Sequence, residues 1–254
     1  MILNQPYIVE ETSDFAVVFK PQKMHSAMLK QKDGGTLFEW YSAQSPPVFD
    51  LMHRLDFETH GLVLFAKTKK SFEFFKALQD RGEFIKEYSA VCANAVSADS
   101  VSAEGFPPPP DIGRLNPSLE KPLIIESYFR PYGRGRKLVR PVINDGKKHK
   151  EIATDKGGFY KTEITGINDK VFTVRIRRGF RHQIRCHLCW IGFPILNDPL
   201  YDQVYNQVSV YNQAPTEPDQ NLALRAHALF FTDPSSGKQR EYCIEPLSSE
   251  LFRN

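Results

Sequence analysis

The chain consists of short strand-like segments that are not separated by helices in regular alternation, and this pattern restricts the class of fold. Residues 61–66 form a near-continuous apolar run, which is typical of a strand buried on both faces. Residues 172–177 (FTVRIR) alternate strictly between apolar and polar side chains, which predicts a strand with one buried face. The sequence therefore predicts a mixed α+β fold, with a mainly antiparallel sheet and helices packed on it.

Turn and cap residues place the other predicted elements. Ser71 can cap a helix over residues 71–80, and Gly82 stands where that helix should stop. A second helix is predicted after Gly179, and Gly192 follows its last apolar position. Further strands are predicted over residues 7–9, 15–19, 86–93, 222–231 and 239–244.

Two tracts are predicted to be irregular. Residues 104–122 contain many prolines, which fix the backbone and remove hydrogen-bond donors, so we expect a connecting loop. Residues 131–158 are rich in Gly, Lys and Arg and are long for a structureless loop, which indicates a function or mobility.

Length and composition limit the setting of the fold. The 254 residues can form one large domain, 1–254, which we expect to divide at most into two subdomains around a central cleft. No run approaches the roughly 20 apolar residues that a membrane helix needs, and no secretory signal is visible. Four cysteines do not make a disulfide framework in so long a chain. We therefore expect a cytoplasmic protein, and a monomer because no long apolar interface helix stands out.

The net charge of +3 conceals a strongly uneven distribution. Between Arg130 and Arg185 the chain carries 16 Lys and Arg against 5 Asp and Glu, whereas the remainder carries 17 against 25. One basic surface on an otherwise acidic body is the pattern expected for a polyanionic partner, although a solvated lysine-rich loop would give the same count.

Asp56 is the first candidate for chemistry, because it stands immediately before the buried segment 61–66. A carboxylate at the end of a sheet can be a nucleophile held charged by an arginine, here Arg54, or one half of a structural ion pair. Two other readings stay open. Asp56 and Glu58 could form the carboxylate pair of a hydrolase, and His53, Asp56 and His60 could hold a metal.

A second candidate lies where strand is predicted to pass into helix, in the sequence RRGFRHQIR at residues 177–185. Arg181 and Arg185 would lie one turn apart on a helix and share a face. Arginine forks beside the donors of a helix start suit a phosphate group, although a solvated helix start is the alternative. Cys186 and Cys189 fit either the buried side of this helix or, with nearby histidines, a metal site; we expect no metal.

Two further pairs share a strand face without indicating a function by themselves. Lys86 and Tyr88 should point the same way on the strand 86–93, and so should Arg225 and His227 on the strand 222–231. Packing and catalysis explain both pairs equally well.

Four segments in chain order resemble the motifs of the RluA-type pseudouridine synthase family. They are HRLD at 53–56 with Thr59 and GLVL at 61–64, KEY at 86–88, HQIRCHL at 182–188, and Gly192 with PIL at 194–196 and DPLY at 198–201. Lys20-Pro21 and His227-Ala228 also fall where that family has similar residues. The resemblance spans most of the chain and implies the pseudouridine synthase catalytic core.

The resemblance implies an isomerase that converts uridine into pseudouridine in ribosomal or transfer RNA, without cofactor or metal. Asp56 would be the catalytic nucleophile, Arg185 would pair with it, and Tyr88 would stack on the base and assist deprotonation. Arg54 would help to hold the nucleotide flipped out, and Ile184 would line the pocket. The remaining substrate-binding residues would be Arg181, His182 and Gln183.

Several positions depart from the family pattern and bear on the choice of RNA rather than on catalysis. His60 replaces a serine, and Phe180 displaces an arginine by one position to Arg181. Asn197 and Asp202 stand where glycines are expected. The small N-terminal RNA-binding domain common in the family cannot fit before Lys20, so we expect specificity to come from the core and its loops. An RNA-binding protein that has lost turnover is the alternative function.

Overall fold

The computed structural model describes residues 5–27, 35–45, 47–93, 106–112, 117–143, 158–201 and 221–252. The chain divides into two compact units. Unit 1 contains residues 1–88 and 225–246, and unit 2 contains residues 89–224 and 247–254. The chain therefore leaves unit 1 within strand β5 (Ile85–Val91) and returns to it at the start of strand β10 (Leu224–Thr232).

Unit 1 has a mixed sheet with strand order β1-β2-β4-β10-β5. The remaining bounds are β1 Tyr7–Glu11, β2 Phe15–Lys20, β3 Asp50–Leu51, β4 His60–Ala66 and β11 Gln239–Cys243. β11 pairs with β10, and β3 pairs with β4. β2 and β4 are antiparallel, whereas β4 and β10 are parallel and bring together segments far apart in the sequence.

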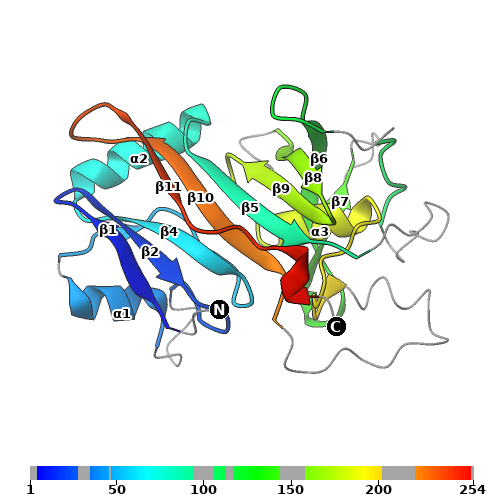
Figure 1. Cartoon of the computed structure of the whole chain (residues 1–254), viewed down its shortest axis with the longest axis horizontal. Helices are drawn as coiled ribbons and strands as arrows, with labels where there is room; N and C mark the ends of the chain where they lie inside the picture. Colours follow the sequence, from blue (N-terminus) through cyan, green and yellow to red (C-terminus); the bar gives the residue numbers. More distant parts are fainter. Residues whose placement is uncertain are drawn as a thin grey trace. The chain divides into compact units, whose positions relative to one another are not determined.

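Strand β4 is buried at every position because a helix covers each of its faces. Leu62 and Leu64 belong to the same apolar cluster as Phe75 of helix α2 (Lys69–Arg81). On the opposite face, the ring of Phe65 packs against Tyr41 of helix α1 (Leu37–Gln44), with 4.7 Å between ring centroids. Figure 1 shows both helices beside the strands of this unit. The apolar run at 61–66 is thus a strand buried on both faces, as predicted.

Helix α2 begins earlier than its predicted start at Ser71. Thr68 is the N-cap residue and forms a capping box with Ser71, whose side chain returns a hydrogen bond to the cap. At the other end Gly82 adopts a left-handed backbone conformation (φ 73°), as expected for the residue that ends a helix.

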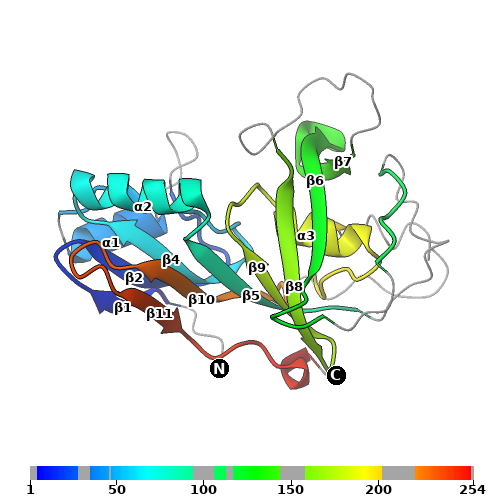
Figure 2. The same ribbon diagram turned by 90° about the horizontal axis from the view of Figure 1, so that it is seen from above.

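Unit 2 contains an antiparallel sheet with strand order β9-β8-β6-β7, and helix α3 packs against β7 and β8. The bounds are β6 Leu123–Tyr132, β7 Leu138–Val142, β8 Tyr160–Asn168, β9 Val171–Ile176 and α3 Gln183–Trp190. Two short 3-10 helices cover Arg134–Arg136 and Ser249–Phe252. The buried cluster between sheet and helix contains Phe129, Val139, Cys186, Cys189 and Tyr201. Figure 2 shows α3 beside these strands.

The fold confirms the α+β class and most of the predicted elements, with one clear error. The tract 131–158 was predicted to be irregular, yet it contains the end of β6, a 3-10 turn and all of β7. Two Pro, two Gly and several Arg obscure this hairpin because they interrupt the strand composition. Residues 144–157 of the tract lie outside the described residues. In the described parts of 104–122 there is neither helix nor strand, as predicted.

Within the part of the chain that the structure describes, no helix is both long and apolar enough to cross a membrane.

The contact between β4 and β10 depends on Gly61. This residue has φ +126°, a backbone conformation that side chains rarely adopt, and a Cβ placed on it would lie 2.2 Å from the carbonyl oxygen of Ala226. The two backbones therefore approach so closely that only glycine fits. Gly61 lies one position after His60, at the entry to β4, so the same contact anchors the chain that arrives from Asp56.

We expect Gly61→Ala to destabilise the protein by about 3 kcal/mol or more, because overpacking and backbone strain act together. Gly179→Ala is the matched control, since a Cβ there meets Ile176 at an ordinary 3.6 Å. Urea unfolding of both variants measures the difference. Equal stability of the two variants would contradict the close approach.

Candidate active site

Asp56 lies on a turn that leads into β4. Residues 57 and 58 form the turn, and the Thr59 N–H donates to the Asp56 carbonyl at 3.1 Å. Leu55 and Thr59 are buried, whereas Asp56 is only partly buried. Asp56 and Glu58 do not lie on a strand, because residues 57 and 58 form this turn. The carboxylate-pair hydrolase loses its structural basis.

The segment 20–26 braces this turn from one side. The Ser26 hydroxyl donates to the Leu55 carbonyl at 2.9 Å and accepts from the Leu55 N–H at 3.0 Å. The Lys23 N–H donates to the Phe57 carbonyl at 2.9 Å. Hydrogen bonds on both sides of Asp56 therefore hold its backbone.

Lys20, at the end of β2, is the cation that the structure places near Asp56 within unit 1. Its side chain is fully buried, and its ammonium donates to the carbonyls of Pro21 at 2.9 Å and Met24 at 2.7 Å. Burial lowers the pKa of Lys20 to about 7, although the nearby carboxylates of Asp56 and Glu58 act to raise it. Lys20 therefore changes charge close to neutral pH.

Tyr88 and Lys86 of β5 are both buried and stand on either side of the partly buried Glu87. Burial raises the pKa of Tyr88 well above its usual value, and the charge of Asp56 raises it further. The structure thus brings Asp56 and Tyr88 together, with the phenol protonated at neutral pH. Burial also lowers the pKa of Lys86 to about 7, and its Nζ lies 4.7 Å from the centroid of the Phe84 ring.

His53 and His60, the histidines near Asp56 in the sequence, each accept a hydrogen bond at Nε2. His53 Nε2 accepts from the Leu64 N–H at 3.2 Å, and His60 Nε2 accepts from Arg225 Nε at 2.8 Å. Burial lowers the pKa of both rings, that of His60 to about 3, so both are neutral. A nitrogen lone pair that accepts a hydrogen bond cannot also bind a cation, which argues against a metal held by His53, Asp56 and His60. Among the described residues, no group of three or more His, Cys, Asp or Glu side chains could hold a metal ion.

The other predicted residues of unit 1 divide between surface and core. Arg54 is exposed. Arg225 and His227 contact different strands: Arg225 reaches His60 of β4, and His227 lies 3.0 Å from Glu87 of β5. These two residues therefore tie β10 to its neighbours on both sides.

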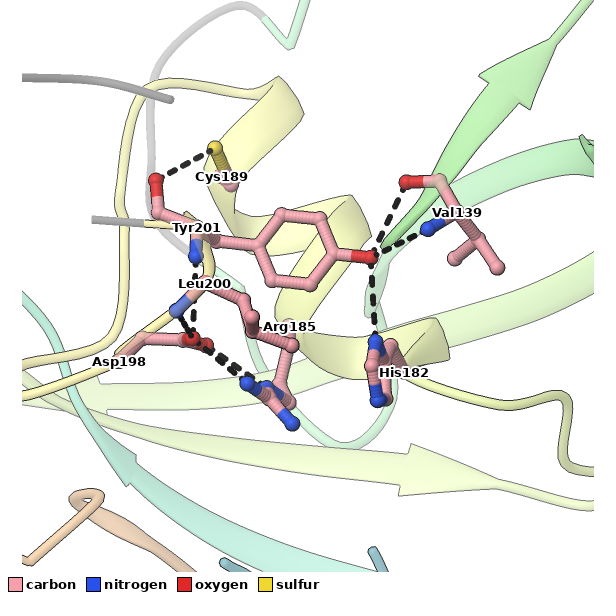
Figure 3. A network of polar contacts seen from close by, with 7 residues as sticks. All are labelled: Val139, His182, Arg185, Cys189, Asp198, Leu200 and Tyr201. Atoms are coloured by element: carbon pink, nitrogen blue, oxygen red, sulfur yellow. Dashed lines mark hydrogen bonds and ion pairs between the residues drawn. The ribbon is translucent and has the colours of Figure 1, made fainter. Parts of the chain in front are cut away.

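In unit 2, Arg185 forms a buried ion pair with Asp198 (Figure 3). Nε and Nη2 of Arg185 donate to the two carboxylate oxygens at 2.8 and 2.7 Å, and the side chains are 2% and 0% exposed. Asp198 also accepts the N–H groups of Leu200 and Tyr201 at 2.9 and 3.0 Å. The carboxylate thus fixes the guanidinium and the loop after α3 at the same time.

Tyr201 connects this pair to the β6–β7 hairpin (Figure 3). Its hydroxyl donates to the Val139 carbonyl and accepts from the Val139 N–H, each at 3.0 Å. The same oxygen lies 3.5 Å from Nδ1 of His182, which immediately precedes α3 and has a left-handed backbone (φ 56°). Histidine tolerates this conformation better than most residues.

The other predicted residues around the start of α3 serve the fold in ways that the sequence did not indicate. The Gln183 amide donates to Lys161 O and Thr162 Oγ1 of β8, and Ile184 is 5% exposed. Arg181 lies before the helix and donates to the carbonyls of Arg136 and Leu138. The prediction that Arg181 and Arg185 share a helix face is therefore wrong, because α3 begins only at Gln183.

Cys186 and Cys189 are buried on the side of α3 that packs against the sheet. Both are free thiols, and burial raises the pKa of Cys186 well above its usual value. These cysteines take the packing role that the sequence offered as an alternative to metal binding.

Sequence reasoning missed two charged residues of the site. Lys20 was noticed only as part of a Lys-Pro pair. Asp198 lies in one of the segments that resemble the family motifs, but its pairing with Arg185 was not predicted. Asp198 is the only Asp or Glu in the sequence between Arg185 and Tyr201. A buried arginine needs a carboxylate, so this spacing was a usable signal.

The chain thus has an α+β fold, with a turn-borne aspartate near a buried tyrosine in unit 1 and a buried arginine–aspartate ion pair in unit 2. Residues 14–190 match the family described as RNA pseudouridylate synthase, well over half of the chain. The chain belongs to this family.

Individual relatives agree with the family model. The chain is 28% identical over 92% of its length to an uncharacterised RNA pseudouridine synthase homologue of Mycoplasma pneumoniae, of which it covers 66%. It is 25% identical over 76% of its length to ribosomal large subunit pseudouridine synthase D of Escherichia coli O157:H7, of which it covers 52%. The chain spans less than two thirds of the length of these curated relatives.

Solved structures support the fold. Human RNA pseudouridylate synthase domain containing 1 superimposes with a TM-score of 0.63 at 19% identity, and the match covers 98% of this chain and 86% of that one. Human RNA pseudouridylate synthase domain containing 4 gives a TM-score of 0.56 at 15% identity, over 96% and 90% of the two chains.

The structure explains three of the four departures from the family pattern. Asn197 replaces an expected glycine and has φ 59°, a conformation that asparagine tolerates well. Phe180 stacks on Phe129 with 5.2 Å between ring centroids, so it belongs to the core of unit 2. His60 receives the hydrogen bond of Arg225. Asp202 lies outside the described residues.

We expect Asp198→Asn to destabilise the protein by about 3 kcal/mol or more, because it leaves the buried Arg185 charge uncompensated. Glu83→Gln is the matched control, since its pair with Arg81 is 50% and 53% exposed and should contribute less than about 1 kcal/mol. Chemical denaturation compares the two. A cost for Asp198→Asn no larger than the control would contradict the buried pair.

We expect the unfolding free energy of wild type, measured relative to that of Lys86→Met, to increase with pH. The folded pKa of Lys86, about 7, lies below its ordinary value of 10.5, so the unfolded chain holds more protons between these pH values. The difference in unfolding free energy should grow by up to ~1.4 kcal/mol per pH unit between pH 7 and about 10. Urea titrations at pH 7, 8 and 9 measure it, with the 76% exposed Lys69→Met as control. A difference that stays constant with pH would show that Lys86 is not desolvated.

Proposed function

We propose that this protein is an RNA pseudouridine synthase that isomerises uridine within an RNA chain, with Asp56 as the residue that initiates the reaction. The observation that carries the proposal is the placement of Asp56 on a braced turn beside buried Tyr88, in a chain of the RNA pseudouridylate synthase family. The reaction breaks the bond between the sugar and N1 of uracil, and forms a bond from the same sugar carbon to C5. One proton leaves C5 and one joins N1, so no other reactant is needed.

Asp56 can open the sugar–base bond by attacking the sugar or by removing a proton from it. Either route needs a charged carboxylate in a fixed position. The hydrogen bonds from the 20–26 segment supply the position, and Lys20 is a buried cation close to the carboxylate.

Tyr88 would contact the base that Asp56 acts on. Its raised pKa keeps the hydroxyl protonated, so the phenol serves as a flat surface and a hydrogen-bond donor rather than as a standing phenolate. Assistance in removing the C5 proton would then need a proton acceptor, for which the carboxylate of Asp56 is suited once the new bond between the sugar and C5 has formed and released it.

Arg185 would complete the site by pairing with Asp56. Its Nε and Nη2 are directed to Asp198, and a guanidinium has five N–H donors in a planar fork. Because Asp198 already balances the charge of Arg185, this contact would contribute directed hydrogen bonds more than net charge.

RNA must deliver the uridine in an extruded form, since the sugar–base bond is unreachable inside a stacked helix. Extrusion costs a few kcal/mol, which phosphate contacts and aromatic stacking can offset. The excess of Lys and Arg over residues 130–185, and the exposed Arg54, are suited to those phosphates. Ile184, His182, Gln183 and Arg181 would shape the substrate side of unit 2, with Arg181 and Gln183 acting through the loops that they hold.

Ribosomal RNA is the substrate that we favour over transfer RNA, because several relatives are named ribosomal large subunit pseudouridine synthase D. Mapping pseudouridines in total RNA from cells with and without the gene tests this choice. Loss of a modification in ribosomal RNA supports it, and loss only in transfer RNA overturns it. The monomeric state and the absence of a cofactor stay part of the proposal.

We expect Asp56→Asn to abolish pseudouridine formation while its affinity for RNA stays within a few fold of wild type, because the amide keeps the shape but cannot act as nucleophile or base. The assay uses purified protein with total RNA from cells that lack the gene. Glu58→Gln is the matched control on the same turn and should retain most of the activity.

Three outcomes would contradict this assignment. Turnover by Asp56→Asn would remove the proposed nucleophile. Release of free uracil would indicate a hydrolase. If the wild-type protein bound RNA from cells that lack the gene but formed no pseudouridine in it, the protein would be an RNA-binding protein that has lost catalysis.

A further inference from the structure

Phe57 is an exposed aromatic residue that directly follows Asp56, on a turn whose backbone is held by hydrogen bonds. Its side chain is 39% exposed, whereas Leu55 and Thr59 on the same turn are 7% and 2% exposed. Leu55 and Thr59 thus anchor the turn in the protein, and Phe57 points out of it. A single exposed apolar residue is ordinary, so its position beside Asp56 and its neighbours must carry the inference.

The backbone of Phe57 is held from the 20–26 segment. Its carbonyl accepts hydrogen bonds from the Lys23 N–H at 2.9 Å and from Lys20 Nζ at 3.4 Å. The adjacent Asp56 carbonyl is held by Thr59. An exposed ring on so braced a backbone loses little conformational freedom when it binds a partner.

The Phe57 ring lies against the ring of His25, with 4.6 Å between centroids and 41° between planes. His25 is itself partly buried, and its carbonyl accepts from the Leu37 N–H at the start of α1. His25 therefore supports Phe57 from the protein side. Two rings form one aromatic surface, which we call the Phe57–His25 platform, immediately next to Asp56.

We infer that the Phe57–His25 platform stacks on the nucleobase next to the target uridine. The inference rests on the proposed function and adds a residue that selects and positions the RNA. When uridine leaves the stack, one face of its neighbouring base loses its partner. Phe57 directly follows Asp56 on the same turn, and its ring is exposed to a partner that approaches Asp56. The platform would therefore cover the neighbouring base while Asp56 acts on the sugar of the target uridine.

Stacking also explains why an aromatic residue is useful there. Every base has a π face, so an aromatic side chain binds it with little preference for sequence, and apolar side chains are used to fill steps that a protein has opened. Arg54, exposed on the same segment, can reach the adjacent phosphate. Together they would hold the RNA on both sides of the everted nucleotide.

The test compares Phe57→Leu, which keeps an apolar side chain without the ring, with Phe57→Trp, which keeps the π face. The substrates are an RNA oligonucleotide that contains the mapped uridine, and the same RNA with an abasic residue on either side of it. We expect Phe57→Leu to raise KM on the intact RNA about tenfold, equivalent to ~1.4 kcal/mol, with kcat within twofold. Phe57→Trp should behave like wild type.

The abasic substrates distinguish stacking from a structural role. Wild type should lose about tenfold on one of them, and on that RNA Phe57→Leu should cost nothing further. Phe49→Leu is the matched control, because Phe49 is also an exposed aromatic residue (44%) packed on another ring, that of Phe72. The Phe49 N–H donates to the Ala66 carbonyl, so Phe49 lies at the end of β4 away from Asp56. Thermal unfolding checks that the variants fold alike.

The proposed platform would be overturned if Phe57→Leu had the same KM as wild type on intact RNA. It would also be overturned if Phe57→Leu had the same loss relative to wild type on every abasic substrate. Absence of turnover by wild type on all substrates would instead overturn the proposed function.

Discussion

The most demanding constraint in this molecule is the charge of Arg185, which is almost completely withdrawn from water. A buried guanidinium cannot shed its proton, so the protein must supply a carboxylate and satisfy the remaining bonds of that carboxylate. Asp198 meets both needs, because it accepts from Arg185 and from two backbone N–H groups of the following loop. The loop then places Tyr201 against Val139, so the same set of hydrogen bonds links helix α3, the loop after it and the β6–β7 hairpin.

Unit 1 solves a related problem in a different way. Lys20 is also buried, but its partners inside hydrogen-bonding distance are backbone carbonyls, and the carboxylates of Asp56 and Glu58 act on it through their charge. Lysine can lose its proton where arginine cannot, so this cation is adjustable whereas Arg185 is permanent. In the proposed enzyme, Arg185 would remain charged at every pH at which the protein folds, whereas the charge of Lys20 near Asp56 would vary with pH.

Local patterns predicted those parts of the fold that depend on a single element. The apolar run of β4, the alternation of β9 and the Gly82 end of α2 needed no knowledge of their neighbours. The β6–β7 hairpin was missed because its arginines and Pro141 weaken strand composition, and its stability comes from Tyr201 and α3. The candidate site residues Asp56 and Tyr88 were proposed from motifs in the sequence. The partners Lys20 and Asp198 were not, because long-range burial selects them rather than local spacing.

The parallel pairing of β4 with β10 has a consequence for how the protein is made. His60 and Arg225, which this pairing joins, are separated by 165 positions, so the entry to β4 has no neighbour on that side until β10 has been synthesised. Loop closure over this span slows folding. A chain interrupted before residue 225 would leave β4 as an open, apolar edge, which is a recognised template for aggregation. Its two units are therefore not separable segments that could be expressed one at a time.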